Sequence, residues 1–149
     1  MKKLLKLILL LVVLALIAGI VYVATYMLSL PDDTDEGKML VKQSWISEDE
    51  KFTLQLGKSS TFSVTEDTGD GAEIVMRGVY KLHPDENRME LLCDPFHMDL
   101  PDDWAVSKHS SIYYELDAPK NDKDVLKLVI NFGTNAKPAQ ITFVPGKEE

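Results

Sequence analysis

The chain has 149 residues, of which residues 1–30 carry three lysines and no acid, while residues 31–149 carry 13 basic and 24 acidic side chains, a difference of −11. So acidic a segment repels phosphate backbones, which excludes nucleic acid from the expected partners. The single cysteine, Cys93, excludes an intramolecular disulfide, so the fold has to depend on its hydrophobic core.

The first predicted element is a membrane anchor within residues 1–30. Residues 7–30 contain no charge and are mostly Leu, Val, Ile and Ala. About 20 apolar residues cross a hydrocarbon core as a helix, because each residue adds about 1.5 Å. Lys2, Lys3 and Lys6 precede this run and acids follow it. The positive-inside bias therefore predicts a single-pass protein of the cell membrane, with a cytoplasmic N-terminus and an extracytoplasmic remainder.

A cleaved signal peptide is the competing interpretation of the same segment. The apolar region of a signal peptide usually has about 7–15 residues and ends at small residues. This run is longer, and a cleavage site after Ala18 has Leu16 at its −3 position. Ile20 stands where a bacterial lipoprotein signal requires Cys, which excludes lipidation there. The uncleaved anchor is preferred, and the signal peptide stays open.

Beyond the anchor, residues 31–38 predict a polar linker and residues 39–149 predict one extracytoplasmic domain, which has an ordinary size for a single core. Apolar residues there recur with period two, as in strands with one buried face. Turn formers separate about eight such segments. Their spacing predicts an antiparallel barrel, with a β-sandwich as the alternative. The segments lie around residues 39–46, 52–56, 61–65, 72–82, 89–92, 112–116, 126–132 and 141–143.

The longest predicted strand covers residues 72–82. Its alternation places Ile74, Met76, Gly78 and Tyr80 on one face. A glycine within a strand suggests a bend or a bulge, which is expected at Gly78.

Residues 94–110, DPFHMDLPDDWAVSKHS, interrupt the alternating pattern. Pro101, followed by Asp102 and Asp103, predicts the first turn of a short helix. A long loop with one small helix in a compact domain often serves as a lid or a binding loop.

The order of these signals resembles the small lipocalin-like domains of bacterial envelope proteins over about residues 39–145. The similar elements are a Trp after an apolar residue, an "l-x-l" strand, a "tFs" strand, a "GxY" strand with its hairpin and two closing strands. Here they are Val41 to Trp45, Leu54-Gln55-Leu56, Thr61-Phe62-Ser63, Gly78-Val79-Tyr80, Asp124 to Leu128 and Ile141-Thr142-Phe143. The resemblance implies a barrel of about eight strands and no particular function.

Catalytic and metal chemistry find little support in the sequence. Cys93 and His97 are four residues apart and could form a thiolate pair, but no residue pattern supplies an orienting group or an oxyanion hole. The acids and histidines of residues 94–110 match neither zinc nor calcium spacing. No catalytic residue, metal or cofactor is therefore predicted.

Six aromatic residues are candidates for binding a ligand. A barrel of eight strands can enclose one small apolar molecule, and residues 93–110 could instead form a protein-docking surface. The same side chains could equally fill the interior as core, which is favoured in a domain of this size. The candidates are Trp45, Phe62, Tyr80, Phe96, Trp104 and Tyr114.

These patterns favour a membrane-anchored, non-enzymatic module that binds a protein or a small apolar ligand. The alternative is an envelope hydrolase or metal-dependent enzyme that uses residues 93–110. That alternative requires Cys93, His97 and His109 to converge in a cleft. A subunit of a larger membrane complex, contacted through the helix, is a third possibility.

Overall fold

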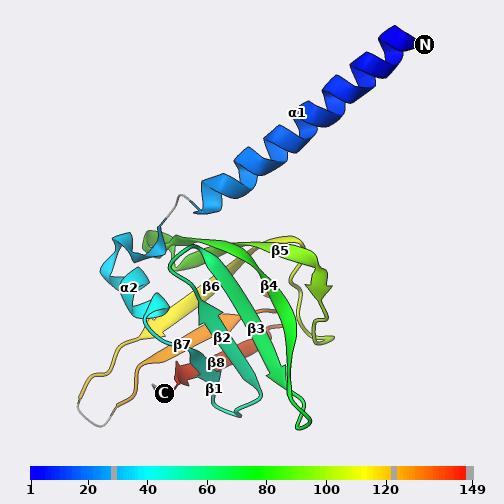
Figure 1. Cartoon of the computed structure of the whole chain (residues 1–149). Coiled ribbons are helices and arrows are strands. Elements are labelled where there is room, and N and C mark those ends of the chain that lie inside the picture. Colours follow the sequence, from blue (N-terminus) through cyan, green and yellow to red (C-terminus); the bar gives the residue numbers. More distant parts are fainter. Residues whose placement is uncertain (28–29, 122–123, 147–149) are drawn as a thin grey trace.

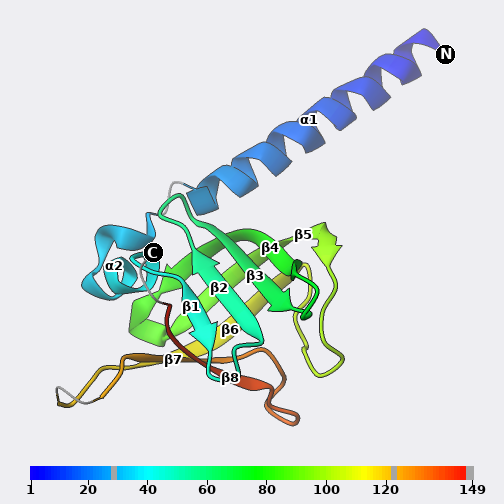
Figure 2. The same cartoon turned by 60° about the horizontal axis from the view of Figure 1, so that its bottom comes forward.

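The computed structural model describes residues 1–27, 30–121 and 124–146, and it consists of a long N-terminal helix and a closed β-barrel (Figures 1 and 2). Residues 28–29 of the predicted anchor and residues 147–149 at the end of the predicted domain lie outside the described part.

The N-terminal helix α1 (Lys2–Met27) projects away from the barrel (Figure 1). From Lys3 to Thr25 it is long and apolar enough to cross a membrane, and its most apolar 18-residue window has no buried residue. Leu9, Leu16 and Ile20 are examples of its exposed side chains. A helix of a soluble domain would bury one apolar stripe, so the exposed surface of α1 fits a lipid environment or a signal sequence.

A short helical segment follows where a linker and a strand were predicted. It comprises η1 (Pro31–Asp33) and α2 (Asp35–Val41), and the prediction of a strand over residues 39–46 is wrong except near its end. The reason is local: the Thr34 hydroxyl accepts a hydrogen bond from the Gly37 N–H at 3.0 Å and caps α2. Acidic residues in the first turn favour the helix further.

Eight antiparallel strands form the barrel, each hydrogen-bonded to the next, and the first pairs with the last. This arrangement confirms the predicted eight-stranded barrel and excludes the sandwich. Closure also leaves no exposed sheet edge. The strands are β1 (Trp45–Ser47), β2 (Phe52–Leu56), β3 (Thr61–Asp67), β4 (Ala72–His83), β5 (Arg88–Met98), β6 (His109–Asp117), β7 (Lys127–Asn131) and β8 (Gln140–Pro145), with η2 (Pro84–Glu86) between β4 and β5.

The interior is a single hydrophobic cluster made by the inward side of every strand. Alternate residues of β2 and β7 are buried, as period two requires. Among the largest fully buried side chains are Trp45, Tyr80, Phe132 and Phe143. The hydrophobic core that the single cysteine made necessary is therefore located inside the barrel.

Two register shifts involve β4. Val64 pairs with Met76 and Thr65 with Ile74, so Val75 is an extra residue that alters the predicted faces of β4. The other shift lies between Met76 and Gly78, and its extra residues are on β5. Ile74, predicted to share a face with Met76, is 42% exposed, whereas Met76 is fully buried. The shift expected at Gly78 is confirmed, and a Cβ atom there would lie 2.1 Å from the Leu92 carbonyl oxygen. Gly78 is required because two backbones approach closely at the bulge.

Candidate functional site

Five of the six predicted ligand-binding aromatics are core residues. Trp45, Phe62, Tyr80, Trp104 and Tyr114 are all buried and belong to the same hydrophobic cluster. The sixth residue does not join them, because Phe96 on β5 is 89% exposed. The structure therefore brings five of the candidates together as packing and leaves one on the surface.

One end of the barrel is filled by the segment between β5 and β6, where Trp104 is buried. Its ring stacks on that of Phe132 with centroids 4.0 Å apart and tilts against Phe52 at 5.2 Å. The predicted helix at Pro101 is wrong: the Trp104 N–H closes a turn by donating to the Pro101 carbonyl, and the segment continues irregularly. Asp102 and Asp103 are exposed in the turn, and insertion of Trp104 takes precedence over helix formation.

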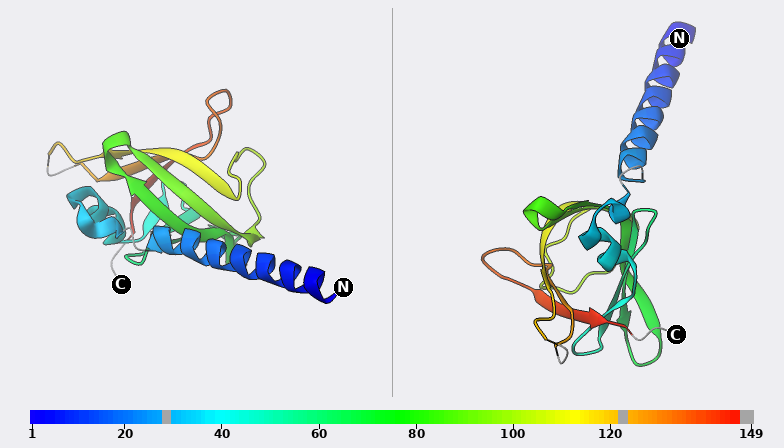
Figure 3. Two further views of the ribbon diagram at one scale, coloured as in Figure 1. Left: turned by 90° about the horizontal axis from the view of Figure 1, so that it is seen from above. Right: turned by 90° about the vertical axis from the view of Figure 1, so that its left-hand side faces the viewer.

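The helix α2 lies near another part of the barrel rim, as the right-hand view of Figure 3 shows. The Trp45 indole N–H donates to the Leu40 carbonyl at 2.9 Å, and Leu40 itself is fully buried. The Tyr114 hydroxyl donates to the Glu36 carboxylate at 2.6 Å. Burial, together with this hydrogen bond, raises the pKa of Tyr114 above its usual range. Two of the candidate aromatics thus fasten α2 to the barrel.

The prominent hollows of the described residues are open grooves on the outside of the barrel. One of about 530 Å³ is lined by side chains that include Gln55, Ser63 and Arg77. These residues alternate with buried neighbours along β2, β3 and β4, so they face outward. The groove is not the aromatic cavity that a barrel carrying an apolar ligand would need.

The three residues of the catalytic alternative do not form a common site. Cys93 is buried in the core, and burial raises the pKa of its thiol to about 11. His97 Nδ1 lies 2.8 Å from an Asp94 oxygen on the surface. His109 contacts Tyr22, whose hydroxyl lies 3.3 Å from Nδ1. A neutral thiol buried in a hydrophobic cluster is a poor nucleophile.

The buried Cys93 thiol should react with iodoacetamide at pH 8 only when the protein unfolds. Its raised pKa also has a consequence for stability: the contribution is complete below pH 9 and is lost as pH rises toward 11, because the unfolded chain ionises first. A Cys93→Ala variant should lack this alkaline loss, whatever its stability at pH 7. Rapid alkylation of the native protein at pH 8, followed by mass spectrometry, would contradict the buried placement.

A distorted segment of β5 presents the exposed Phe96. Cys93 pairs with Gly78 and Met98 pairs with Met76, so residues 94–97 bulge opposite Arg77 alone. Asp94 organises the bulge by accepting from the Phe96 N–H at 3.0 Å and by pairing with Arg77 and His97. These donors, the Phe96 N–H first, hold the pKa of Asp94 below its usual range. We refer to residues 94–97 as the Phe96 bulge.

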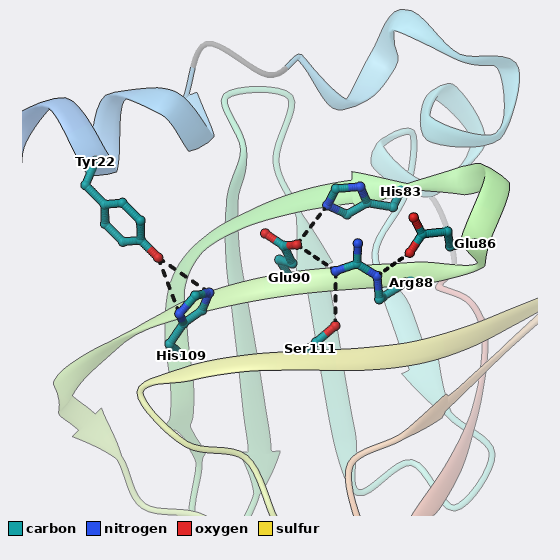
Figure 4. A network of polar contacts seen from close by, with 7 residues as sticks. All are labelled: Tyr22, His83, Glu86, Arg88, Glu90, His109 and Ser111. Atoms are coloured by element: carbon teal, nitrogen blue, oxygen red, sulfur yellow. Dashed lines mark hydrogen bonds and ion pairs between the residues drawn. The ribbon is translucent and has the colours of Figure 1, made fainter.

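A polar network covers the outer face near η2 (Figure 4). The Arg88 guanidinium donates to Glu86 at 2.7 Å, to Glu90 at 2.6 Å and to Ser111 at 3.2 Å. His83 Nε2 lies 3.1 Å from Glu90. Hydrogen bonds from Arg88 lower the pKa of both carboxyl groups. The lowered pKa values favour the ionised carboxylates at neutral pH, and the network connects the turn end of the β4–β5 hairpin to β6.

No group of three or more His, Cys, Asp or Glu side chains positioned to hold a metal occurs among the described residues. Comparison of the chain with protein-family models finds no match, and neither does comparison with curated proteins or with solved structures. The geometry of this chain is therefore the basis for inferring its function.

Proposed function

We propose that this protein is a membrane-tethered, non-enzymatic binding module whose working surface is the outside of the barrel. In this proposal α1 is an uncleaved single-pass anchor, the N-terminus is cytoplasmic and the barrel is extracytoplasmic. The observation that carries the proposal is the placement of five of the six aromatic candidates in a packed core. A small apolar ligand would have to displace side chains such as Trp104, which stacks on Phe132.

We favour a protein partner bound to the outer surface over a small molecule bound inside the barrel. The segment from residue 31 onward has an excess of 11 acidic side chains, which favours encounter with a basic partner and disfavours an acidic one. The catalytic alternative lacks support, because Cys93 is buried and His97 is paired with Asp94. The resemblance to lipocalin-like envelope domains agrees with the proposal at the level of fold.

Topology is tested by labelling the full chain in bacterial spheroplasts with a membrane-impermeant maleimide. Val125→Cys, at a site 55% exposed between β6 and β7, should react in intact spheroplasts. Lys3→Cys should react only after permeabilisation, and Cys93 should stay unlabelled in both. The intact mass of the extracted protein should include residues 1–30. The opposite labelling pattern, or a mass that lacks the N-terminal segment, would refute the anchor.

Native mass spectrometry of the full chain, released from detergent, tests the second part of the proposal. We expect the mass of the polypeptide alone, since core side chains occupy the interior. A small apolar molecule that remains bound after detergent removal would instead identify a carrier.

A further inference from the structure

We propose that the Phe96 bulge inserts into the lipid–water interface of the membrane that α1 crosses, so that the barrel lies against the membrane at a fixed orientation. This inference rests on the proposed function, because it requires α1 to be a membrane anchor. It assigns the bulge a ligand class, a lipid surface, and distinguishes this part of the barrel from the surface left for a protein partner.

Helix α1 touches the barrel through Tyr22, near the C-terminal end of the helix. Tyr22 lies three residues before the end of the apolar stretch at Thr25, a depth at which aromatic residues meet the headgroups. Its hydroxyl lies 3.3 Å from His109 Nδ1, and the two rings meet edge-on at 6.1 Å (Figure 4). The first residue of β6 therefore lies at the level of the interface.

The contact of Tyr22 with His109 lies close to the Phe96 bulge, because His109 pairs with the strand that carries the bulge. His109 pairs with Leu92 on β5, and the Cys93 N–H donates to the Lys108 carbonyl at 2.8 Å. The bulge begins at the next residue, Asp94. Figures 1 and 3 show the C-terminal end of β5 on the side of the barrel toward which α1 leans. A membrane surface perpendicular to α1 would thus come close to this end of β5.

The Phe96 bulge combines an exposed aromatic ring with an ordered backbone. Phe96 is 89% exposed, which is unfavourable for a large apolar ring in water. The hydrogen bonds of Asp94 to the Phe96 N–H and to His97 keep the bulge ordered, so insertion would cost little conformational entropy. The nearby Lys108 is exposed and could meet lipid phosphates, whereas the acidic barrel as a whole disfavours anionic lipids. Zwitterionic lipids are the expected surface.

The short linker between α1 and η1 keeps the barrel close to the membrane that α1 crosses. Only three residues separate Met27, the end of α1, from Pro31, the start of η1. Four Cα–Cα steps span at most about 15 Å. Pro31 packs against Gly37 of α2, and the Leu40 carbonyl accepts from Trp45 of the barrel. The barrel therefore stays at the membrane surface, where the ordered Phe96 side chain meets a high effective concentration of lipid.

The test is the fluorescence of a Phe96→Trp variant of the full chain in phosphatidylcholine vesicles with bromine near the headgroup end of the acyl chains. The native Trp45 and Trp104 are buried and supply a constant background. The matched control is Val125→Trp, in the loop between β6 and β7, which lies away from α1 in Figure 1. We expect blue-shifted emission that brominated lipid quenches for Phe96→Trp, and neither effect for the control.

Flotation of the vesicles separates the two possible failures. If the chain floats with lipid but the tryptophan placed at residue 96 emits as in water and is not quenched, the bulge does not insert, and the anchor is unaffected. If the chain does not float, the anchor itself fails and this inference fails with it. Equal quenching at both positions would show general association of the barrel with lipid and would overturn a specific role for the bulge.

Discussion

Replacing Trp45 by alanine is expected to lower the free energy of unfolding by about 3–5 kcal/mol, as large-to-small changes of buried aromatics do. Trp45 is fully buried in the barrel. Its removal would leave a cavity and would also remove the indole N–H that donates to the Leu40 carbonyl. Because a domain is stable by only about 5–15 kcal/mol, this loss should be visible as a lower denaturation midpoint of the full chain in detergent, followed by circular dichroism.

Two further variants separate packing from the hydrogen bond. Trp45→Phe keeps an aromatic ring but leaves the Leu40 carbonyl without its donor, and it should cost less than Trp45→Ala. Tyr113→Ala is the surface control, because Tyr113 is 62% exposed on β6; its effect should stay within about 0.5 kcal/mol. A Trp45→Ala protein as stable as the parent would show that α2 and the core do not depend on this residue.

The barrel could be predicted from the sequence because its strands alternate cleanly. In β2, Phe52, Leu54 and Leu56 point inward and the residues between them do not, which is the period-two pattern of a sheet with one buried face. Closure could not be read from that pattern, since a sandwich has the same alternation. It depends on the pairing of β1 with β8, a contact between the two ends of the domain.

The errors have local causes. Met39 to Val41 do not form the predicted strand, because Thr34 caps a helix that runs through them. Ile74 does not share the buried face of Met76, because Val64 pairs with Met76 and Thr65 with Ile74, which leaves Val75 as an extra residue on β4. A bulge inserts a residue without changing composition, so simple alternation misassigns every position beyond it.

The candidate site was predicted only as a set of aromatic residues. Periodicity indicates which side chains point inward, but whether an interior is hollow depends on the volumes of all of them and on what closes the ends. The prominence of Phe96 had a weak signal in Asp94-Pro95, because proline cannot donate in a ladder and an Asp often bonds the N–H two residues on. The contact of Tyr22 with His109, 87 positions apart, had none.

The other large loss of stability is expected on replacing Trp104, and its size also tests whether the barrel can hold a ligand. Trp104→Ala should also cost about 3–5 kcal/mol, because its ring fills the barrel end by stacking on Phe132 and packing against Phe52. Phe96→Ala is the matched control from the same predicted binding loop; its exposed ring should change the unfolding free energy by no more than about 0.5 kcal/mol. Chemical denaturation of the full chain in detergent measures both.

This pair of variants distinguishes two roles for Trp104. The residue is either a plug, meaning a permanent part of the core at the barrel end, or a gate that moves to admit a ligand. A plug that is part of the core has to stay inserted for the barrel to be stable, so its loss destabilises the protein without any ligand. If Trp104→Ala were as stable as Phe96→Ala, the residue would be free to leave the interior, and the barrel end could open to an apolar molecule. The protein would then be better described as a carrier than as a module that binds on its outer surface. A binding cavity requires a side chain at its entrance that can move out without destabilising the fold.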